Sequence, residues 1–177
     1  KTQPLVASGH ACGFGRAASS GTLMVTGHDM TRKRSRRSRS LRRDVGFVMQ
    51  HPERQLFADT VAEDVAYGPS NLGLDASEAM ERAMQAMRLL HIEHLRDRSP
   101  FDLSGGQQRL VAIAGVIACE PKALILDEPT AGLDEEAAAR VHGLIHELKS
   151  RGVTILLISH SQDEVDELAD RTIMLGK

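Results

Sequence analysis

From residue 121 onward, the chain alternates short apolar runs with longer amphipathic segments. The apolar runs cover residues 123–126, 154–159 and 171–175, and each has the length of a buried β-strand. The segments between them, residues 134–151 and 162–169, are predicted α-helices. Near-continuous apolar strands joined by helices predict a parallel sheet that is covered on both faces. We therefore expect an α/β fold with a ligand site beyond the carboxyl ends of its strands.

Two acidic residues, Asp127 and Glu128, directly follow the first of these strands in the sequence ILDE. Placing two carboxylates at the end of a core strand is unfavourable unless they are paired or bind a cation, because their desolvation costs several kcal/mol. Mg²⁺ with a nucleotide phosphate would satisfy Asp127 and leave Glu128 to orient or deprotonate a water. The simpler alternative is a pair of N-cap acids on a surface loop.

A glycine-rich sequence, LSGGQ at residues 103–107, stands just before an apolar run at residues 110–119 that is typical of a buried helix. Two adjacent glycines allow a tight turn and the close approach of another group. A turn at the start of a helix presents free N–H groups, which suit a phosphate. The alternative is a plain turn before a core helix.

Two further polar residues follow predicted strands. Gln50 comes directly after the apolar run at residues 45–49, and His160 ends the run at residues 154–159. Of the eight histidines, His160 is the best placed, because its strand is predicted to adjoin the strand that carries Asp127.

The stretch between Gln50 and LSGGQ is predicted to be mostly helical. Residues 61–67 form one predicted helix, which Gly68 and Pro69 are expected to end. Asp75 is the predicted N-cap of a second helix that runs to about residue 91. The methionines and alanines of this second helix fall on one face, which favours a core face over a docking surface.

In chain order these motifs read Gln50, LSGGQ, ILDE, AGLD at residues 131–134 and SH at residues 159–160. This set resembles the ATP-binding cassette (ABC) ATPases over roughly residues 21–177. The resemblance implies a P-loop NTPase-like fold, with a mostly parallel sheet flanked by helices and a small α-helical signature subdomain. It places a RecA-like ATPase core in residues 22–52 and 120–177, and the signature subdomain in residues 53–119. Residues 1–21 are predicted to be irregular or the remnant of a P-loop.

The resemblance also implies roles for single residues and the cofactors ATP and Mg²⁺. Glu128 would be the general base, while Gln50 and His160 would sense the γ-phosphate. Asp127 would bind Mg²⁺ through water, and Gln50 would touch the same ion. The implied nucleotide contacts of the signature loop and the D-loop are Ser104, Gly105, Gly106, Gln107 and Asp134.

The P-loop of the family, GxxGxGK[ST], has no complete match in this chain, because the glycines at 9, 13 and 15 are not followed by Lys-Ser or Lys-Thr. One interpretation takes Lys1 and Thr2 as the end of a P-loop. Both would then bind nucleotide, and Thr2 would also bind Mg²⁺. Residues 3–20 would form the following helix, although each interior glycine costs about 1 kcal/mol relative to alanine. The chain looks like a family member truncated at both ends, or one whose N-terminal segment has diverged or been misread. We therefore expect weak or no nucleotide binding and hydrolysis by the chain alone.

Residues 45–74, which include QLF and EDVAYGP, resemble the cobalt and energy-coupling-factor importers. This resemblance implies a second ATPase subunit, either identical or different, and transmembrane transporter subunits as partners. It also implies a peripheral position on the cytoplasmic face of the cell membrane and transport of a metal ion or vitamin. LSGGQ of one copy would close over the nucleotide of the other.

Two other functions stay open. Residues 32–43 hold eight basic residues, which would suit a nucleic-acid-associated ABC ATPase or an anionic lipid surface but are more typical of a solvated connector. The short stretch between Gln50 and Leu103 suits a compact helical subdomain rather than a coiled coil, and the net charge is −2, so no nucleic-acid partner is expected. The other possibility is an inert fragment that only complements a partner ATPase.

The two cysteines and the apolar runs bear on the compartment. Cys12 and Cys119 stand far apart without zinc-site spacing, which favours a reducing cytosol. No apolar run approaches the ~18 residues of a membrane span.

Overall fold

The computed structural model describes residues 5–8, 24–25, 28–29 and 39–174. Five parallel strands form one sheet in the order β4-β5-β6-β1-β7. Their bounds are β1 (Leu5–Ser8), β4 (Val45–Val48), β5 (Ala123–Asp127), β6 (Thr154–Ile158) and β7 (Thr172–Met174). A second, antiparallel pair joins β2 (Met24–Val25) to β3 (His28–Asp29). The predicted parallel α/β sheet is therefore confirmed.

The register of β5 and β6 aligns buried residues of the two neighbouring strands. Leu126 pairs with Leu157, and Asp127 pairs with Ile158. The leucines are each at most 2% exposed, so both strands bury apolar side chains that would otherwise face water. The pairing also brings the acidic end of β5 beside the end of β6.

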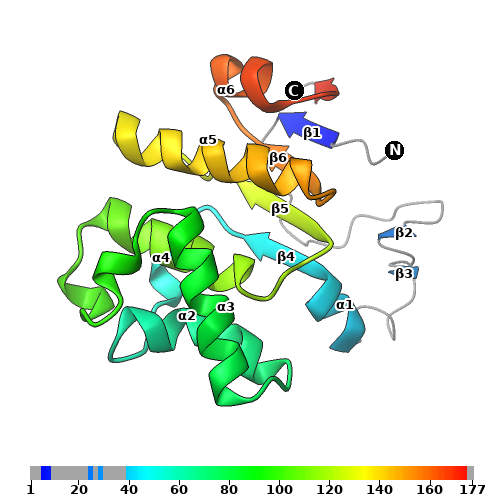
Figure 1. The fold of residues 1–177 in the computed structure, drawn as a ribbon. Helices are drawn as coiled ribbons and strands as arrows, with labels where there is room; N and C mark the ends of the chain where they lie inside the picture. The colour runs from blue at the N-terminus through cyan, green and yellow to red at the C-terminus, as the bar shows by residue number, and fades with distance from the viewer. Residues whose placement is uncertain (1–4, 9–23, 26–27, 30–38, 175–177) are drawn as a thin grey trace.

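Helices cover this sheet and form a second, mainly helical part beside β4 (Figure 1). The second part contains α2 (Val61–Asn71), α3 (Ala76–Leu89) and α4 (Gly105–Ile117), with short 3-10 helices η2 (Pro52–Gln55), η3 (Glu93–Leu95) and η4 (Pro100–Asp102). The other helices are α1 (Arg39–Asp44), α5 (Glu135–Ser150) and α6 (Gln162–Leu168). One continuous hydrophobic cluster joins the helical part to the sheet. The longest described helix, α5, has 16 residues, so the described part of the chain contains no long coiled coil.

The first helix of the helical part is longer than its sequence indicates. Gly68 and Pro69 lie inside α2, which continues to Asn71, so the prediction that they end the helix is wrong. Pro69 lacks only its own N–H, and the amide of Leu72 still donates to the carbonyls of Gly68 and Pro69. Pro69 is buried, so tertiary packing outweighs the loss of one helical hydrogen bond.

The other helix of this stretch follows its prediction closely. Asp75 caps α3 by accepting from the amides of Ser77 and Glu78, at 2.9 and 3.0 Å. Ala79, Ala83 and Met87 are buried, so the stripe of methionine and alanine is a core face. Met80, at 37% exposed, is the exception.

The start of the chain differs from its prediction. Leu5–Ser8, expected within an irregular segment or a P-loop helix, is strand β1. It lies between β6 and β7 and pairs with both in parallel, with Leu5 opposite Leu156 and Ser8 opposite Met174. Its carboxyl end therefore lies at the same edge of the sheet as those of β5 and β6. A run of four residues is too short to show the alternation of apolar and polar side chains that is typical of a strand. Strand β1 is therefore recognised only from its pairing with β6 and β7.

No helix among the described residues is long and apolar enough to cross a membrane.

Candidate functional site

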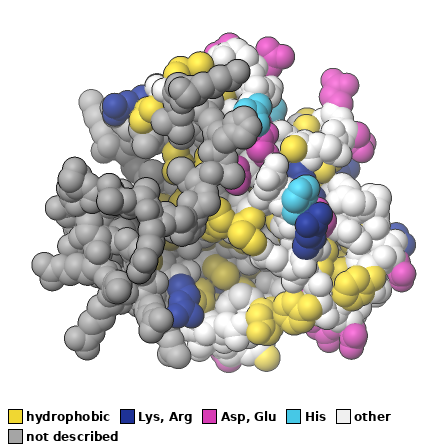
Figure 2. Space-filling view, turned by 180° about the vertical axis from the view of Figure 1, so that it is seen from behind, with side chains coloured by type: hydrophobic (Ala, Val, Ile, Leu, Met, Phe, Trp, Pro, Cys, Tyr) yellow, Lys and Arg dark blue, Asp and Glu magenta, His cyan; other side chains and the backbone are white. Residues whose placement is uncertain are grey.

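Four of the predicted site residues lie at one edge of the sheet. Asp127 is the last residue of β5 and Glu128 the next, while Gln50 and His160 each come two residues after the end of β4 and β6. Because these three strands are parallel and adjacent, their carboxyl ends meet at this edge. Histidine and acidic side chains lie side by side on the face seen in Figure 2. The fold thus assembles the group that the sequence predicts.

Glu128 is held in an unusual conformation beside His160. Its φ of 49° lies in the left-handed region, which is strained for a residue with a Cβ. The amide of Glu128 donates to the carbonyl of Ile158 at 2.9 Å and so extends the β5–β6 ladder by one residue. This turn places Glu128 Oε1 3.4 Å from His160 Nε2.

The same Oε1 atom is buried and has no hydrogen-bond partner among the described residues. The contact with His160 is close enough for an ion pair but does not meet hydrogen-bond geometry. A buried carboxylate oxygen without a donor costs free energy, so the position favours a donor that arrives with a ligand, such as water. Glu128 Oε1 is therefore placed to accept a hydrogen bond from such a ligand at the edge of the sheet.

The acidic pair also bears on metal binding. The described residues hold no cluster of three or more His, Cys, Asp or Glu side chains that could cage a metal ion. Mg²⁺ is usually held by one or two carboxylates together with substrate phosphates and water. Half-buried Asp127 fits that mode of binding, in which most ligands come from outside the protein.

The LSGGQ sequence begins α4, and its polar side chains bond to each other. The hydroxyl of Ser104 accepts from the amide of Gln107 at 3.3 Å, and Gln107 Oε1 accepts from the amide of Ser104 at 3.1 Å. This capping box fixes the start of the helix. A Cβ added to Gly105 would meet no atom within 4 Å, so this end of the helix is open to a ligand.

The signature loop and the loop after β5 share a small cavity of about 170 Å³. Its lining includes Ser104, Gly106, Gln107 and Asp134. Asp134 caps α5 through a 2.7 Å bond from the amide of Ala137 to its carboxylate. The cavity thus brings together four of the five residues predicted to contact a partner's nucleotide.

Lys1 and Thr2 lie outside the described residues. The expected helix over residues 3–20 is wrong for Leu5–Ser8, since these residues form a strand that runs towards the site. In P-loops the phosphate-binding residues follow such a strand and begin a helix.

A buried polar network anchors the loop after Glu128 to α6. The hydroxyl of Thr130 donates to Glu164 Oε1 at 2.8 Å, and His142 Nε2 lies 3.4 Å from the same atom. Glu164 is 4% exposed, and its amide donates to the hydroxyl of Ser161 at 3.3 Å. Thr130 comes two residues after Glu128, and Ser161 comes directly after His160. The network therefore fixes the backbone beside both of these candidate site residues.

Sequence reasoning missed Arg109. This residue of α4 is 7% exposed, and its guanidinium donates to the backbone carbonyls of Gln50, Glu128 and Ala131. A charged residue five positions after Ser104, inside an otherwise apolar helix, was the available signal.

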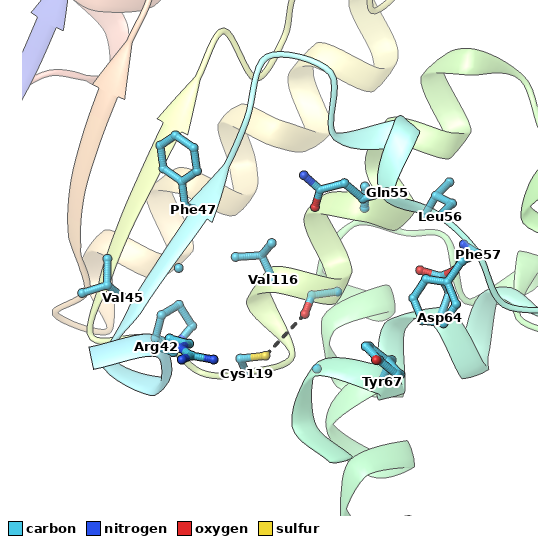
Figure 3. Close-up of a pocket in the computed structure, with 15 residues that line it drawn as sticks. Arg42, Val45, Phe47, Gln55, Leu56, Phe57, Asp64, Tyr67, Val116 and Cys119 are labelled. Atoms are coloured by element: carbon cyan, nitrogen blue, oxygen red, sulfur yellow. Dashed lines mark hydrogen bonds between the residues drawn. The ribbon is translucent and has the colours of Figure 1, made fainter. Parts of the chain in front are cut away.

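A larger cavity, of about 420 Å³, lies between β4 and the helical part (Figure 3). Phe47 and Arg42 lie on the β4 side, while Phe57 and Tyr67 lie on the helical side, with ring centroids 4.6 Å apart in an edge-to-face contact. Phe57 and Tyr67 are 54% and 51% exposed. The cavity therefore presents aromatic surface close to the loop that carries Gln50.

The sequence model of the ABC transporter family matches residues 12–131, which include Gln50, LSGGQ and the acidic pair Asp127 and Glu128. The chain belongs to the ABC transporter family. Its fold agrees: the solved structure of CbiO1 from Clostridium perfringens, described as part of the ABC transporter complex CbiONQ, superposes with a TM-score of 0.81. The two are 34% identical, over 98% of this chain and 74% of CbiO1.

Curated relatives of the chain are described as ATP-binding proteins of transporters. A Bifidobacterium longum protein described as an ABC transporter ATP-binding protein is 64% identical over 135 residues, which make up 76% of this chain and 17% of the relative. The energy-coupling factor transporter ATP-binding protein EcfA2 of Clostridium perfringens is 47% identical over 164 residues. That match covers 89% of this chain and 56% of EcfA2, so the chain spans about half the length of such relatives.

Proposed function

We propose that this chain is the ATP-hydrolysing subunit of an importer of the cobalt or energy-coupling-factor type. The observation that carries the proposal is Glu128, whose buried Oε1 faces His160 at the carboxyl edge of the sheet and has no hydrogen-bond partner among the described residues. Its membership of the ABC family and its identity to EcfA2 support the same assignment. Strand β1 would form the ATPase core together with residues 22–52 and 120–177, because it pairs with β6 and β7, and residues 53–119 would form the signature subdomain.

In the proposed reaction, Glu128 accepts a proton from the water that attacks the γ-phosphate of ATP. The water oxygen forms the new bond to phosphorus as the bond to ADP breaks. His160 and Gln50 would contact the γ-phosphate and the attacking water. Asp127 would hold Mg²⁺ through water, and the ion would neutralise charge on the phosphates.

The proposed assembly is a dimer in which Ser104, Gly105, Gly106, Gln107 and Asp134 of one subunit contact the nucleotide of the other. The open end of α4 and the cavity that these residues share support this arrangement. Membrane subunits would dock on the aromatic cavity beside β4 and place the complex on the cytoplasmic face of the membrane. They would also select the transported metal ion or vitamin.

Glu128→Gln in the full-length protein tests this function. We expect the maximal rate of hydrolysis to fall about 10²–10⁴-fold, because the amide cannot accept the proton of the attacking water. ATP should still bind, since the substitution preserves shape. The measurement is steady-state phosphate release together with ATP binding by calorimetry.

The matched control is Glu147→Gln, which changes an exposed carboxylate of α5 that pairs with Arg151, the residue just after that helix. It should hydrolyse ATP like the unchanged protein. If Glu128→Gln also hydrolyses ATP at the unchanged rate, Glu128 is not the general base.

A further inference from the structure

Arg109 connects the signature helix to both loops of the hydrolytic site. Its Nη2 donates to the carbonyl of Gln50 at 3.0 Å, and its Nη1 donates to the carbonyls of Glu128, at 3.4 Å, and Ala131. Nη2 also lies 3.6 Å from Glu53 Oε2. One side chain from α4 thus contacts the loop after β4 and the loop after β5.

The chemistry of this contact requires an arginine. A guanidinium is a planar fork with five N–H donors, so it can hold several acceptors at fixed angles, whereas a lysine ammonium is a single point charge. The Arg109 side chain is 8% exposed and the Glu53 side chain 22%. Glu53 Oε2 is buried and has no hydrogen-bond partner among the described residues, so the ion pair with Arg109 balances the charge on this oxygen.

The position of Arg109 in α4 determines how a movement of that helix would reach the two loops. It lies on the helix that LSGGQ begins, whose N-terminus is fixed by the capping box of Ser104 and Gln107. A displacement of α4 therefore acts on the backbone of Gln50 and of Glu128 through the same guanidinium. Packed helices and their bonded loops shift as units, so such a movement is transmitted rather than absorbed.

We propose that Arg109 is a positioning residue that couples the signature loop to Gln50 and Glu128. The inference rests on the proposed function, in which LSGGQ contacts the partner's nucleotide while Gln50 and Glu128 serve the nucleotide of their own subunit. Arg109 then links the two nucleotides of a dimer. ATP bound at one site aligns the hydrolytic loops of the other.

A purely structural role makes a different prediction. If Arg109 only satisfies buried carbonyls, its replacement lowers thermal stability while the folded protein hydrolyses ATP as before. If Arg109 couples the sites, its replacement lowers kcat and the cooperativity of hydrolysis in protein that is still folded.

The test uses the full-length dimer and three variants: Arg109→Lys, Glu53→Gln and the two combined. Steady-state hydrolysis is measured as a function of ATP concentration, together with the thermal midpoint. Arg109→Lys should lower kcat about 10-fold or more, with KM changed less than about 3-fold, and bring the Hill coefficient towards 1. Glu53→Gln should lower kcat about 2- to 5-fold, and the combined variant should be no worse than Arg109→Lys alone.

Arg151→Lys is the matched control, because Arg151 is an exposed arginine that pairs with Glu147 at the end of α5. It should leave kcat and the Hill coefficient unchanged. Should Arg109→Lys not fold, Glu53→Gln tests the same link without removing the buried arginine.

The inference is overturned if the folded variants keep the unchanged kcat and Hill coefficient, whatever their thermal midpoints. It is also overturned if the unchanged protein hydrolyses ATP with a Hill coefficient of 1, because its sites are then independent. Failure of the proposed function looks different: the unchanged protein would not hydrolyse ATP at all.

Discussion

Single residues at the carboxyl edge of the sheet owe their properties to the backbone around them. Glu128 occupies a left-handed backbone conformation, and its carboxylate lies beside His160. The amide bond to Ile158 fixes this turn. Strain of this kind persists only where surrounding contacts determine the backbone, and here they include the Arg109 bond to the carbonyl of Glu128.

The ion pair between Glu53 and Arg109 predicts a dependence of stability on pH. Burial acts to raise the pKa of the Glu53 carboxyl, but its backbone hydrogen bond, the charge of Arg109 and the contact with His51 outweigh burial and hold the pKa below its ordinary value of 4.5. A carboxyl whose pKa is lowered by folding stabilises the protein above its unfolded-state pKa. That stabilisation is lost as the pH falls through the folded-state pKa.

We therefore expect the difference in unfolding free energy between the unchanged protein and Glu53→Gln to be constant near neutral pH. It should shrink as the pH falls below about 4.5. Denaturant unfolding of both proteins from about pH 7 to about pH 3 measures it. A difference that is the same at both ends of this range would show that the carboxylate charge does not contribute.

Most of the residues in the site could be predicted from sequence, because Gln50, Asp127, Glu128 and His160 each follow an apolar run that ends at one edge of the sheet. Arg109 could not be assigned a role in this way, since its bonds reach carbonyls of residues far away in the chain. Backbone carbonyls carry no sequence signature, so which of them a buried arginine will contact depends on the tertiary fold.

At the scale of secondary-structure elements, α2 and α4 pack closely against each other at Gly68. A Cβ added there would lie 2.6 Å from Cys119 Sγ and 3.3 Å from the carbonyl of Gly115. That sulfur already donates to the Gly115 carbonyl at 3.6 Å. Gly68 is therefore required by the close approach of α2 to Gly115 of α4 and to Cys119 just after that helix, rather than by its backbone conformation.

Gly68→Ala should destabilise the protein even though alanine favours a helix. Overpacking costs about 1–3 kcal/mol, against a gain of about 0.5–1 kcal/mol in helix propensity. The measurement is the free energy of unfolding in urea.

Gly143→Ala provides the control, because a Cβ at this exposed position of α5 would meet nothing within 4 Å. This variant should gain about 0.5–1 kcal/mol. Stabilisation by both substitutions would contradict the close packing of α2 against α4.

The bounds of the elements show where sequence patterns are sufficient. The strands β5 and β6 and the helices α3 and α5 lie within two residues of their predicted ends, because apolar period and caps agree there. The end of α2 was predicted wrongly, because packing around buried Pro69 overrides its local preference. Strand β1 was missed because its only signal is its pairing with β6 and β7.

At the scale of the whole molecule, the sheet and the helical part share one hydrophobic cluster. The cluster includes Leu124 and Leu126 of the sheet and Val65 and Met87 of the helical part. The carboxyl edge of the sheet and the start of α4 therefore belong to one body, with Arg109 between them. In the proposed dimer each body offers its sheet edge to one nucleotide and its LSGGQ loop to the other.

Mixing two inactive variants of the full-length protein tests this composite site most directly. Ser104→Arg disables the signature loop, and Glu128→Gln disables the general base, so neither alone should hydrolyse ATP. In a mixed dimer, one site combines an intact Glu128 with an intact LSGGQ loop from the other subunit. We predict that phosphate release recovers on mixing, to at most about a quarter of the unchanged rate because half the dimers are mixed and each has one complete site. The rate should lie below that limit, because the subunit with the intact Glu128 carries Ser104→Arg and so loses the coupling through its Arg109. If two variants that are each folded, dimeric and inactive stay inactive when mixed, the two halves of the site do not come from different subunits.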